Sequence, residues 1–134
     1  MKVISTPNAP AAIGPYSQAI VSKGLVYCSG QIAIVPGTGE IVEGGIEEQA
    51  TMVCQNIGAL LKAAETDFTK VIKTTCFLAD MNDFAKFNEV YAKYFVSRPA
   101  RSCVAVKTLP KNVLCEIEVI AEEYSSLDNP FNVK

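Results

Sequence analysis

The sequence predicts an α+β domain in which two helices pack on one face of a β-sheet. Three observations lead to this class. At 134 residues the chain has the length of one domain with a single core. Two segments place apolar residues at helical spacing, and segments rich in β-branched and aromatic residues lie before, between and after them. The expected order is therefore three strands, a helix, a strand, a second helix and two strands.

The first part of the chain is expected to form a small set of strands joined by tight turns. Lys23-Gly24 is a hairpin signal, and the loop at residues 7–15 contains three prolines and a glycine. A further short strand is expected after the turn at residues 36–39. These strands are Val3–Ser5, Ser17–Ser22, Leu25–Gln31 and Glu40–Glu43.

The clearest helix is Ile46–Glu65, whose apolar residues recur three and four positions apart. A second helix is expected after the N-cap candidates at residues 80–83, and Pro99 stops it. An aromatic stripe runs along this second helix, and its simplest interpretation is a contribution to the core. The stripe consists of Phe84, Phe87, Tyr91, Tyr94 and Phe95.

The remaining strands indicate an assembly of several copies. They are expected at Val71–Leu78, Ser102–Val106 and Leu114–Glu123. Segments 25–29 and 113–121 carry apolar residues at both odd and even positions, and therefore on both faces of the strand, which is typical of strands covered on both faces. Two helices cover only one face, so we expect the other face to be covered in a homo-oligomer.

Composition excludes several classes of function. With 12 basic and 14 acidic residues the net charge is −2, which argues against a general nucleic-acid binder. The chain has no histidine, and this removes Ser-His-Asp and Cys-His catalysis. No apolar run is long enough to cross a membrane, and the first residues show no signal-peptide block, so the cytosol is the expected location.

The five cysteines are interpreted as small buried hydrophobes rather than as ligands. They are scattered, odd in number and never form a C-x-x-C pair, so no metal site is expected. Only Cys103 stays a candidate for lining a site. The five are Cys28, Cys54, Cys76, Cys103 and Cys115.

Two charged features stand out from the apolar strands. Arg101 enters an apolar strand, where it is suited to bind a carboxylate or to form an intersubunit salt bridge with a glutamate. Glu116 and Glu118 lie on one face of the last strand, because side chains alternate along a strand. With histidine absent, a glutamate of raised pKa is the best candidate acid-base group, but spacing does not say which of the two it is.

Weaker polar signals lie near the N-terminus and on the second helix. Tyr16 follows Gly14-Pro15 in a rigid turn, and Gly30 at a strand end allows close approach of a ligand to the backbone. Asn88 on the aromatic helix is an ordinary surface residue by its position alone.

As a set, these residues resemble the RidA (YjgF) family of enamine/imine deaminases, whose members are also labelled translation inhibitors or L-PSP endoribonucleases. The resemblance runs from about Ile4 to Glu123, and Arg101 with its flanks is its most specific part. One departure is Glu65, at a position where relatives often have the glycine that ends the first helix. The resembling segments are residues 9–19, 29–31, 73–78, 99–104, 109–111 and 116–121.

The resemblance implies a chorismate-mutase-like fold with a mixed sheet, and a homotrimer with sites in the clefts between subunits. It implies a 2-imino acid substrate such as 2-iminobutanoate or 2-iminopropanoate, hydrolysed to a 2-keto acid and ammonia without a cofactor. Arg101 would hold the substrate carboxylate, and Glu116 rather than Glu118 would position and deprotonate the attacking water.

The same resemblance assigns substrate contacts to four further residues. Tyr16 would line the pocket, the Gly30 and Cys103 backbones would contact the imine end, and Asn88 is a weaker assignment. Residues 1–124 would form the domain, and residues 125–134 a C-terminal extension. The alternatives are a regulatory module that binds a 2-keto acid without turnover and, disfavoured by the net charge, an endoribonuclease or translation inhibitor.

Overall fold

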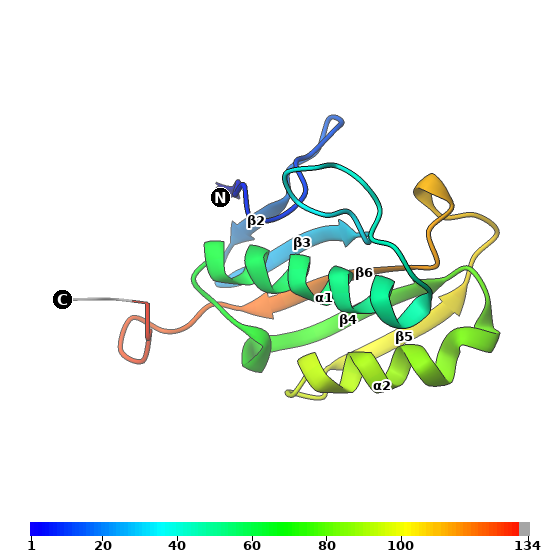
Figure 1. The fold of residues 1–134 in the computed structure, drawn as a ribbon. Coiled ribbons are helices and arrows are strands. Elements are labelled where there is room, and N and C mark those ends of the chain that lie inside the picture. Colours follow the sequence, from blue (N-terminus) through cyan, green and yellow to red (C-terminus); the bar gives the residue numbers. More distant parts are fainter. Residues whose placement is uncertain (132–134) are drawn as a thin grey trace.

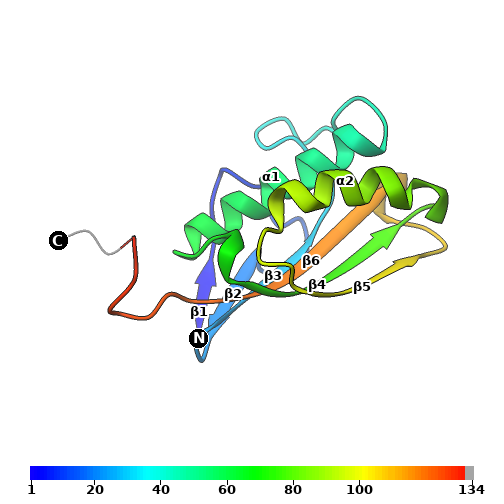
Figure 2. The same cartoon turned by 90° about the horizontal axis from the view of Figure 1, so that it is seen from below.

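The computed structural model describes residues 1–131 and shows one six-stranded sheet with two helices on one of its faces (Figures 1 and 2). The predicted α+β class is confirmed. Three short 3-10 turns, η1 (Phe68–Lys70), η2 (Met81–Asp83) and η3 (Pro110–Asn112), lie in the connections. The helices are α1 (Ile46–Ala63) and α2 (Phe84–Tyr94), and the strands are β1 (Lys2–Ile4), β2 (Ala19–Ser22), β3 (Leu25–Gln31), β4 (Val71–Leu78), β5 (Ala100–Ala105) and β6 (Cys115–Glu122).

The sheet is mixed, with spatial order β1-β2-β3-β6-β4-β5. Only β4 and β5 are parallel among its neighbouring strands, because α2 carries the chain from the end of β4 back to the start of β5. The last strand, β6, then inserts between β3 and β4. This insertion places β6, which carries Glu116 and Glu118, beside Gly30 on β3.

Helix α1 buries the apolar face that its periodicity predicts, and Val53, Ile57 and Leu60 are fully enclosed against the sheet. Its first turn is closed by Glu48, whose side chain accepts a hydrogen bond from the Gly45 amide at 2.8 Å. The helix ends two residues earlier than predicted. Glu65 takes a left-handed conformation (φ 59°), which favours glycine, at a cost of about 1 kcal/mol.

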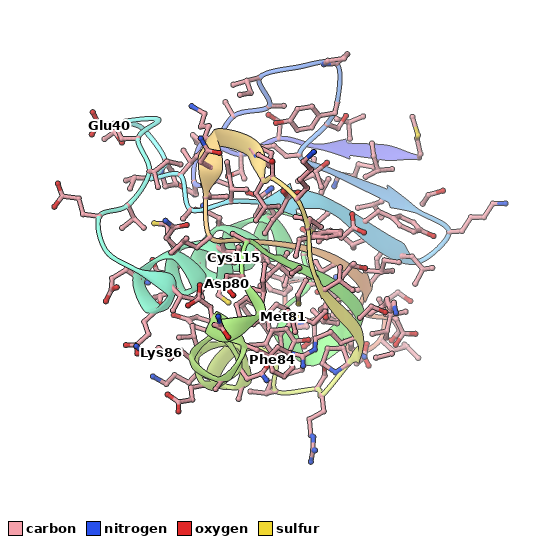
Figure 3. The ribbon with its side chains drawn as sticks, turned by 90° about the vertical axis from the view of Figure 1, so that its right-hand side faces the viewer. Glu40, Asp80, Met81, Phe84, Lys86 and Cys115 are labelled. Carbon is pink, nitrogen blue, oxygen red and sulfur yellow. The ribbon has the colours of Figure 1, made fainter. Side chains whose placement is uncertain are left out.

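Three of the five side chains in the aromatic stripe along α2 are buried. Phe87, Tyr91 and Phe95 are buried, whereas Phe84 and Tyr94 are half-exposed. The Asp80 carboxylate accepts a hydrogen bond from the Asn82 amide at 2.8 Å, which fixes the turn that leads into the helix. Figure 3 shows Asp80, Met81 and Phe84 together at this entry.

One predicted strand is absent, and several predicted strand boundaries differ from the structure by one or two residues. Residues 40–43 form no strand, and only an isolated bridge joins Ile34 to Ile41. Strand β2 begins at Ala19 rather than Ser17, because the Gln18 side chain is hydrogen-bonded into the preceding loop. Strand β5 begins at Ala100, so Arg101 lies inside the strand, in register with Thr74 on β4.

The face of the sheet opposite the helices combines apolar and charged side chains. Along β6, burial alternates: Ile117 and Val119 are buried beneath the helices, and Glu116 and Glu118 lie on the open face. Tyr27 on β3 and Val104 on β5 are exposed large hydrophobic residues, 42% and 47% accessible. The open face is thus less uniformly apolar than predicted, and its burial in a homo-oligomer stays a prediction.

The chain beyond β6 is held by a small polar and aromatic cluster. The Tyr124 hydroxyl donates to the Asp67 carboxylate at 2.6 Å, and Lys70 lies over the Tyr124 ring at 4.9 Å. Phe131 meets the same ring with centroids 6.3 Å apart. Tyr124 is therefore held against η1 just before the predicted extension at 125–134, and residues 132–134 of that extension lie outside the described residues.

Candidate functional site

Glu116 lies directly over Gly30, and the two positions depend on each other. A Cβ atom added to Gly30 would be 2.0 Å from a carboxylate oxygen of Glu116 and 3.0 Å from its carboxyl carbon. Any side chain at this position would therefore displace the carboxylate. Glycine is required here for close approach, and the group that approaches is the candidate acid-base residue itself.

The loop at residues 7–18 forms the wall next to this glutamate. The Gln18 side chain holds the loop by donating to the carbonyls of Thr6 and Pro10 at 3.1 and 2.7 Å and accepting from the Thr6 amide at 2.7 Å. Tyr16, 51% exposed, lies on this loop, and its hydroxyl accepts a long hydrogen bond of 3.5 Å from the Ile13 amide. The loop thus presents a tyrosine ring and hydroxyl beside β3.

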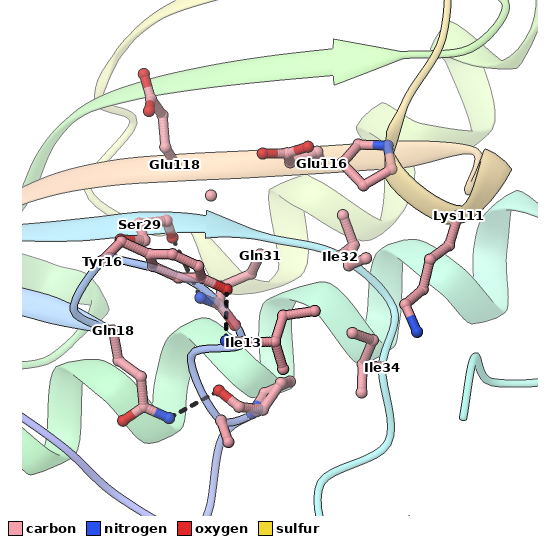
Figure 4. A pocket seen from close by; sticks show the side chains of 14 residues that line it. Ile13, Tyr16, Gln18, Ser29, Gln31, Ile32, Ile34, Lys111, Glu116 and Glu118 are labelled. Carbon is pink, nitrogen blue, oxygen red and sulfur yellow. Dashed lines mark hydrogen bonds between the residues drawn. The ribbon is translucent and has the colours of Figure 1, made fainter. Parts of the chain in front are cut away.

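These residues line one cavity of about 530 Å³. Figure 4 shows Ile13 and Tyr16 on the loop next to β3, and Glu116 and Glu118 on β6. Lys111 also lines the cavity, from a turn in which it takes a left-handed conformation (φ 55°), and its amino group points toward Ile34 rather than toward the glutamates. The cavity therefore combines carboxylates, a phenol and apolar walls.

The environment of Glu116 favours its protonated form. Burial raises the pKa of Glu116 above its ordinary value of 4.5, and the neighbouring Glu118 carboxylate raises it further. A raised pKa brings a carboxyl group nearer to neutral pH, where it can both accept and donate a proton. The two glutamates also differ in burial, because Glu116 is half-buried and Glu118 is exposed.

Arg101 lies elsewhere, beside α2. Its Nη1 donates to the Asn88 side-chain oxygen at 2.7 Å, and its Cζ lies 4.7 Å from the centroid of the Tyr91 ring. Among residues 1–131, no carboxylate lies within salt-bridge distance of this guanidinium. Arg101 and Asn88 line a second cavity of about 740 Å³, together with Arg98 and the helix residues around Tyr91.

The candidate residues fall on opposite faces of the sheet within one chain. Thr74 on β4 is in register with Arg101, whereas Phe77, three residues along the same strand, is in register with Glu116. Residues an odd number of positions apart point to opposite faces. Arg101 therefore faces the helix layer, Glu116 faces the open side, and one chain does not bring the two together.

Cys103 is half-exposed, on the same side of β5 as Arg101 and in register with Cys76. Burial raises the pKa of its thiol, although the Arg101 charge acts in the opposite direction. The other four cysteines are free and buried, as predicted, and burial raises the pKa of Cys28, Cys76 and Cys115 to about 12. All three thiols are therefore protonated at neutral pH.

The structure divides the candidate site residues predicted from the sequence into two groups. Tyr16, Gly30 and Glu116 meet at one cavity, and Asn88 meets Arg101, but as a hydrogen-bond partner of that side chain. The contact between Tyr91 and Arg101 was not predicted from the sequence. Helical periodicity identifies Tyr91 as a core residue, and it does not show that the same side chain also lines a site. Within residues 1–131, no three cysteine, aspartate or glutamate side chains gather as metal ligands do, and no helix is long and apolar enough to cross a membrane.

Comparisons with known proteins agree with the motifs. A family described as Endoribonuclease L-PSP matches residues 6–123. A putative regulator, AldR, from Lactococcus lactis is 58% identical over 91% of this chain and 98% of its own length. Human 2-iminobutanoate/2-iminopropanoate deaminase is 51% identical over 90% of this chain and 88% of its own length.

Solved structures share the fold. A putative endoribonuclease from Thermotoga maritima is 48% identical and superposes with a TM-score of 0.90, covering 93% of this chain and 99% of its own. TdcF from Escherichia coli, solved with bound serine, is 44% identical with a TM-score of 0.88, covering 92% of this chain and 100% of its own. These relatives carry enzyme, regulator and nuclease names for one architecture.

Proposed function

Because the chain belongs to the Endoribonuclease L-PSP family, which is the RidA (YjgF) family that its motifs resemble, we propose that it hydrolyses reactive 2-imino acids to 2-keto acids and ammonia. The single observation that carries this proposal is Glu116 over Gly30, a half-buried carboxyl group of raised pKa that opens into a cavity. A human protein that is 51% identical is named 2-iminobutanoate/2-iminopropanoate deaminase.

The substrate carboxylate would be bound by Arg101. The guanidinium has no carboxylate partner among residues 1–131, and Asn88 occupies only one of its five N–H donors. The remaining donors are sufficient for a two-pronged contact with a planar carboxylate. The side chain is thus available to a small anion without first breaking an ion pair.

The chemical step needs one positioned water and one acid-base group. The water oxygen bonds to C2 of the imine while Glu116 accepts a water proton, and the C=N electron pair moves to nitrogen. Glu116 then returns the proton to that nitrogen, which gives a neutral carbinolamine. Glu116 next accepts the hydroxyl proton of the carbinolamine and passes it to the amino nitrogen, so the C–N bond breaks as the C=O bond forms, and ammonia and the 2-keto acid leave. Orientation and a single general acid-base group supply the rate enhancement, so the sparse inventory of polar residues is adequate.

The site would be completed by a second copy of the chain. Because Arg101 and Glu116 face opposite sides of the sheet, the Arg101 side of one protomer must meet the Tyr16, Gly30 and Glu116 side of another. A contact between two different surfaces forms a ring when its rotation closes, and a ring of three copies is the homotrimer that the resemblance implies. The cytosol stays the predicted location of this assembly.

A second function has its own support. AldR, 58% identical, is named a putative regulator, and TdcF was solved with bound serine, so binding without turnover is the alternative for this cavity. The endoribonuclease or translation-inhibitor function is disfavoured by the net charge of −2.

The test is a reaction in which threonine dehydratase releases 2-iminobutanoate continuously. Adding the protein should increase the rate at which ammonia and 2-ketobutyrate appear. With the Arg101→Ala variant, the rate should equal that measured with the dehydratase and no added protein. If the wild-type protein binds 2-ketobutyrate in calorimetry without increasing that rate, the binding function replaces the enzymatic one.

A further inference from the structure

The Arg101 guanidinium lies against aromatic rings of α2. Its Cζ is 4.7 Å from the Tyr91 centroid and 5.5 Å from the Phe84 centroid. A guanidinium over a ring face is attracted by the ring quadrupole, and the attraction grows as water is excluded. Tyr91 is 9% exposed, so the nearer of the two contacts is made with a ring that is itself part of the core.

The Tyr91 ring is fixed from two other directions. Its hydroxyl shares a 2.7 Å hydrogen bond with the hydroxyl of Thr74, a fully buried residue of β4. The ring also stacks on Phe95, with centroids 4.2 Å apart and planes inclined by 21°. A ring held by a buried hydrogen bond and a stacked neighbour cannot turn freely, so it offers Arg101 a fixed surface.

The same helix holds the edge of the guanidinium. Asn88 precedes Tyr91 by three residues, so the two side chains share one face of α2, and the Asn88 oxygen accepts from Arg101 Nη1 at 2.7 Å. Both partners are neutral. Burial raises the pKa of Tyr91, which keeps its phenol protonated. The pair therefore orients the cation while leaving its charge and its other donors available to a ligand.

We infer that Tyr91, anchored by Thr74, is a positioning residue that holds the Arg101 guanidinium in one orientation before any ligand binds. The identity of the ligand as a 2-imino or 2-keto acid rests on the proposed function, but the positioning of the side chain does not. If Tyr91 acts only as a core residue, replacing it lowers stability and leaves Arg101 unaffected.

The chain offers an internal reference for this test, because its only two arginines are Arg98, which is exposed, and Arg101. In protein labelled with ¹⁵N-arginine, we expect the Arg101 side-chain proton signals to be shifted upfield from those of Arg98 by the ring current of Tyr91. Tyr91→Leu should move them most of the way toward the Arg98 position, leaving only the smaller effect of the more distant Phe84 ring, and Tyr91→Phe, which keeps the ring, should retain most of the shift. Tyr91→Met fills the same space without a ring and replaces Tyr91→Leu if that variant does not fold.

A matched control separates positioning from packing. Phe68→Leu removes a half-buried ring that contacts Tyr94 and Phe95 but makes no contact with Arg101, and it should leave both arginine signals in place. Arg101 signals that stay unchanged in both Tyr91→Leu and Tyr91→Met overturn the inference.

The effect on a ligand is measured by calorimetry with 2-ketobutyrate. Loss of a partly desolvated cation–π contact should weaken binding by Tyr91→Leu about 5- to 30-fold, while Phe68→Leu binds like the wild type. Wild-type affinity in Tyr91→Leu contradicts the inference. If the wild-type protein does not bind 2-ketobutyrate, the proposed function fails, and the arginine signals still decide whether Tyr91 positions Arg101.

Discussion

Replacing Gly30 with alanine is the smallest change that tests the placement of Glu116. The new methyl carbon would lie 2.0 Å from the Glu116 carboxylate oxygen, and carbon and oxygen atoms essentially never approach closer than 3.0 Å. The carboxylate must therefore move by about 1 Å or more, and a misplacement of that size costs about 100-fold in rate. Only the end of a flexible side chain has to move, so the fold should survive.

The assay is turnover of freshly generated 2-iminobutanoate, measured together with thermal unfolding. Gly45→Ala is the matched control, because the nearest atom to its new methyl group would be 3.9 Å away and its backbone is extended (φ −98°). We expect Gly45→Ala to turn over imine like the wild type, and Gly30→Ala to lose about two orders of magnitude with its fold intact. Wild-type turnover in Gly30→Ala would refute the reasoning, because the position of Glu116 would then be unimportant.

The other predictions concern the two charged groups and the assembly. Arg101→Ala should abolish imine hydrolysis and keep the oligomer, and Arg101→Lys should restore little activity, because an ammonium does not reproduce the two-pronged contact. Full activity of Arg101→Lys would show that only the positive charge of the arginine matters. Loss of the oligomer in Arg101→Ala would favour an intersubunit salt bridge. Glu116→Gln should lower turnover about 10²- to 10⁴-fold, whereas Glu118→Gln should change stability or assembly more than turnover; the reverse pattern would exchange their roles. Because the pKa of Glu116 is raised above 4.5 in the folded state, the folded protein binds the carboxyl proton more tightly than the unfolded chain does. The stability that this proton contributes is therefore lost as the pH rises from 4.5 through the raised pKa. Glu116→Gln should therefore raise the melting temperature at about pH 7.5 and leave it nearly unchanged at about pH 3.5; an equal change at both would contradict the raised pKa. Light scattering at micromolar concentration should give a trimer, and a monomer would remove the two-subunit site.

The fold class was predictable because periodicity is a local property. The three- and four-residue spacing in α1 and the β-branched run of β4 identify these elements without any tertiary information. The start of β2 was missed because the Gln18 amide binds carbonyls eight to twelve residues away, and a local pattern does not show such partners. The prediction of a strand at residues 40–43 was wrong for a similar reason, because only Ile41 forms a β-bridge, and its partner is Ile34.

The site was predictable in its residue types but not in its geometry. Spacing places Glu116 and Glu118 on one face and leaves them equivalent, whereas in the structure Glu116 is half-buried over Gly30 and Glu118 is exposed. The relation of Arg101 to Glu116 depends on which residues of β4 each one pairs with, and strand register is set by the whole sheet.

The most direct test of a site shared between two chains is subunit exchange between two inactive variants. Arg101→Ala keeps Glu116, and Glu116→Gln keeps Arg101, so a mixed oligomer contains interfaces that carry both intact groups. After random exchange of equal amounts, verified by native mass spectrometry, about one quarter of the interfaces should be intact, and turnover should return to about one quarter of the wild-type value. Mixed oligomers that form without regaining turnover would contradict a catalytic site built by Arg101 of one chain and Glu116 of another.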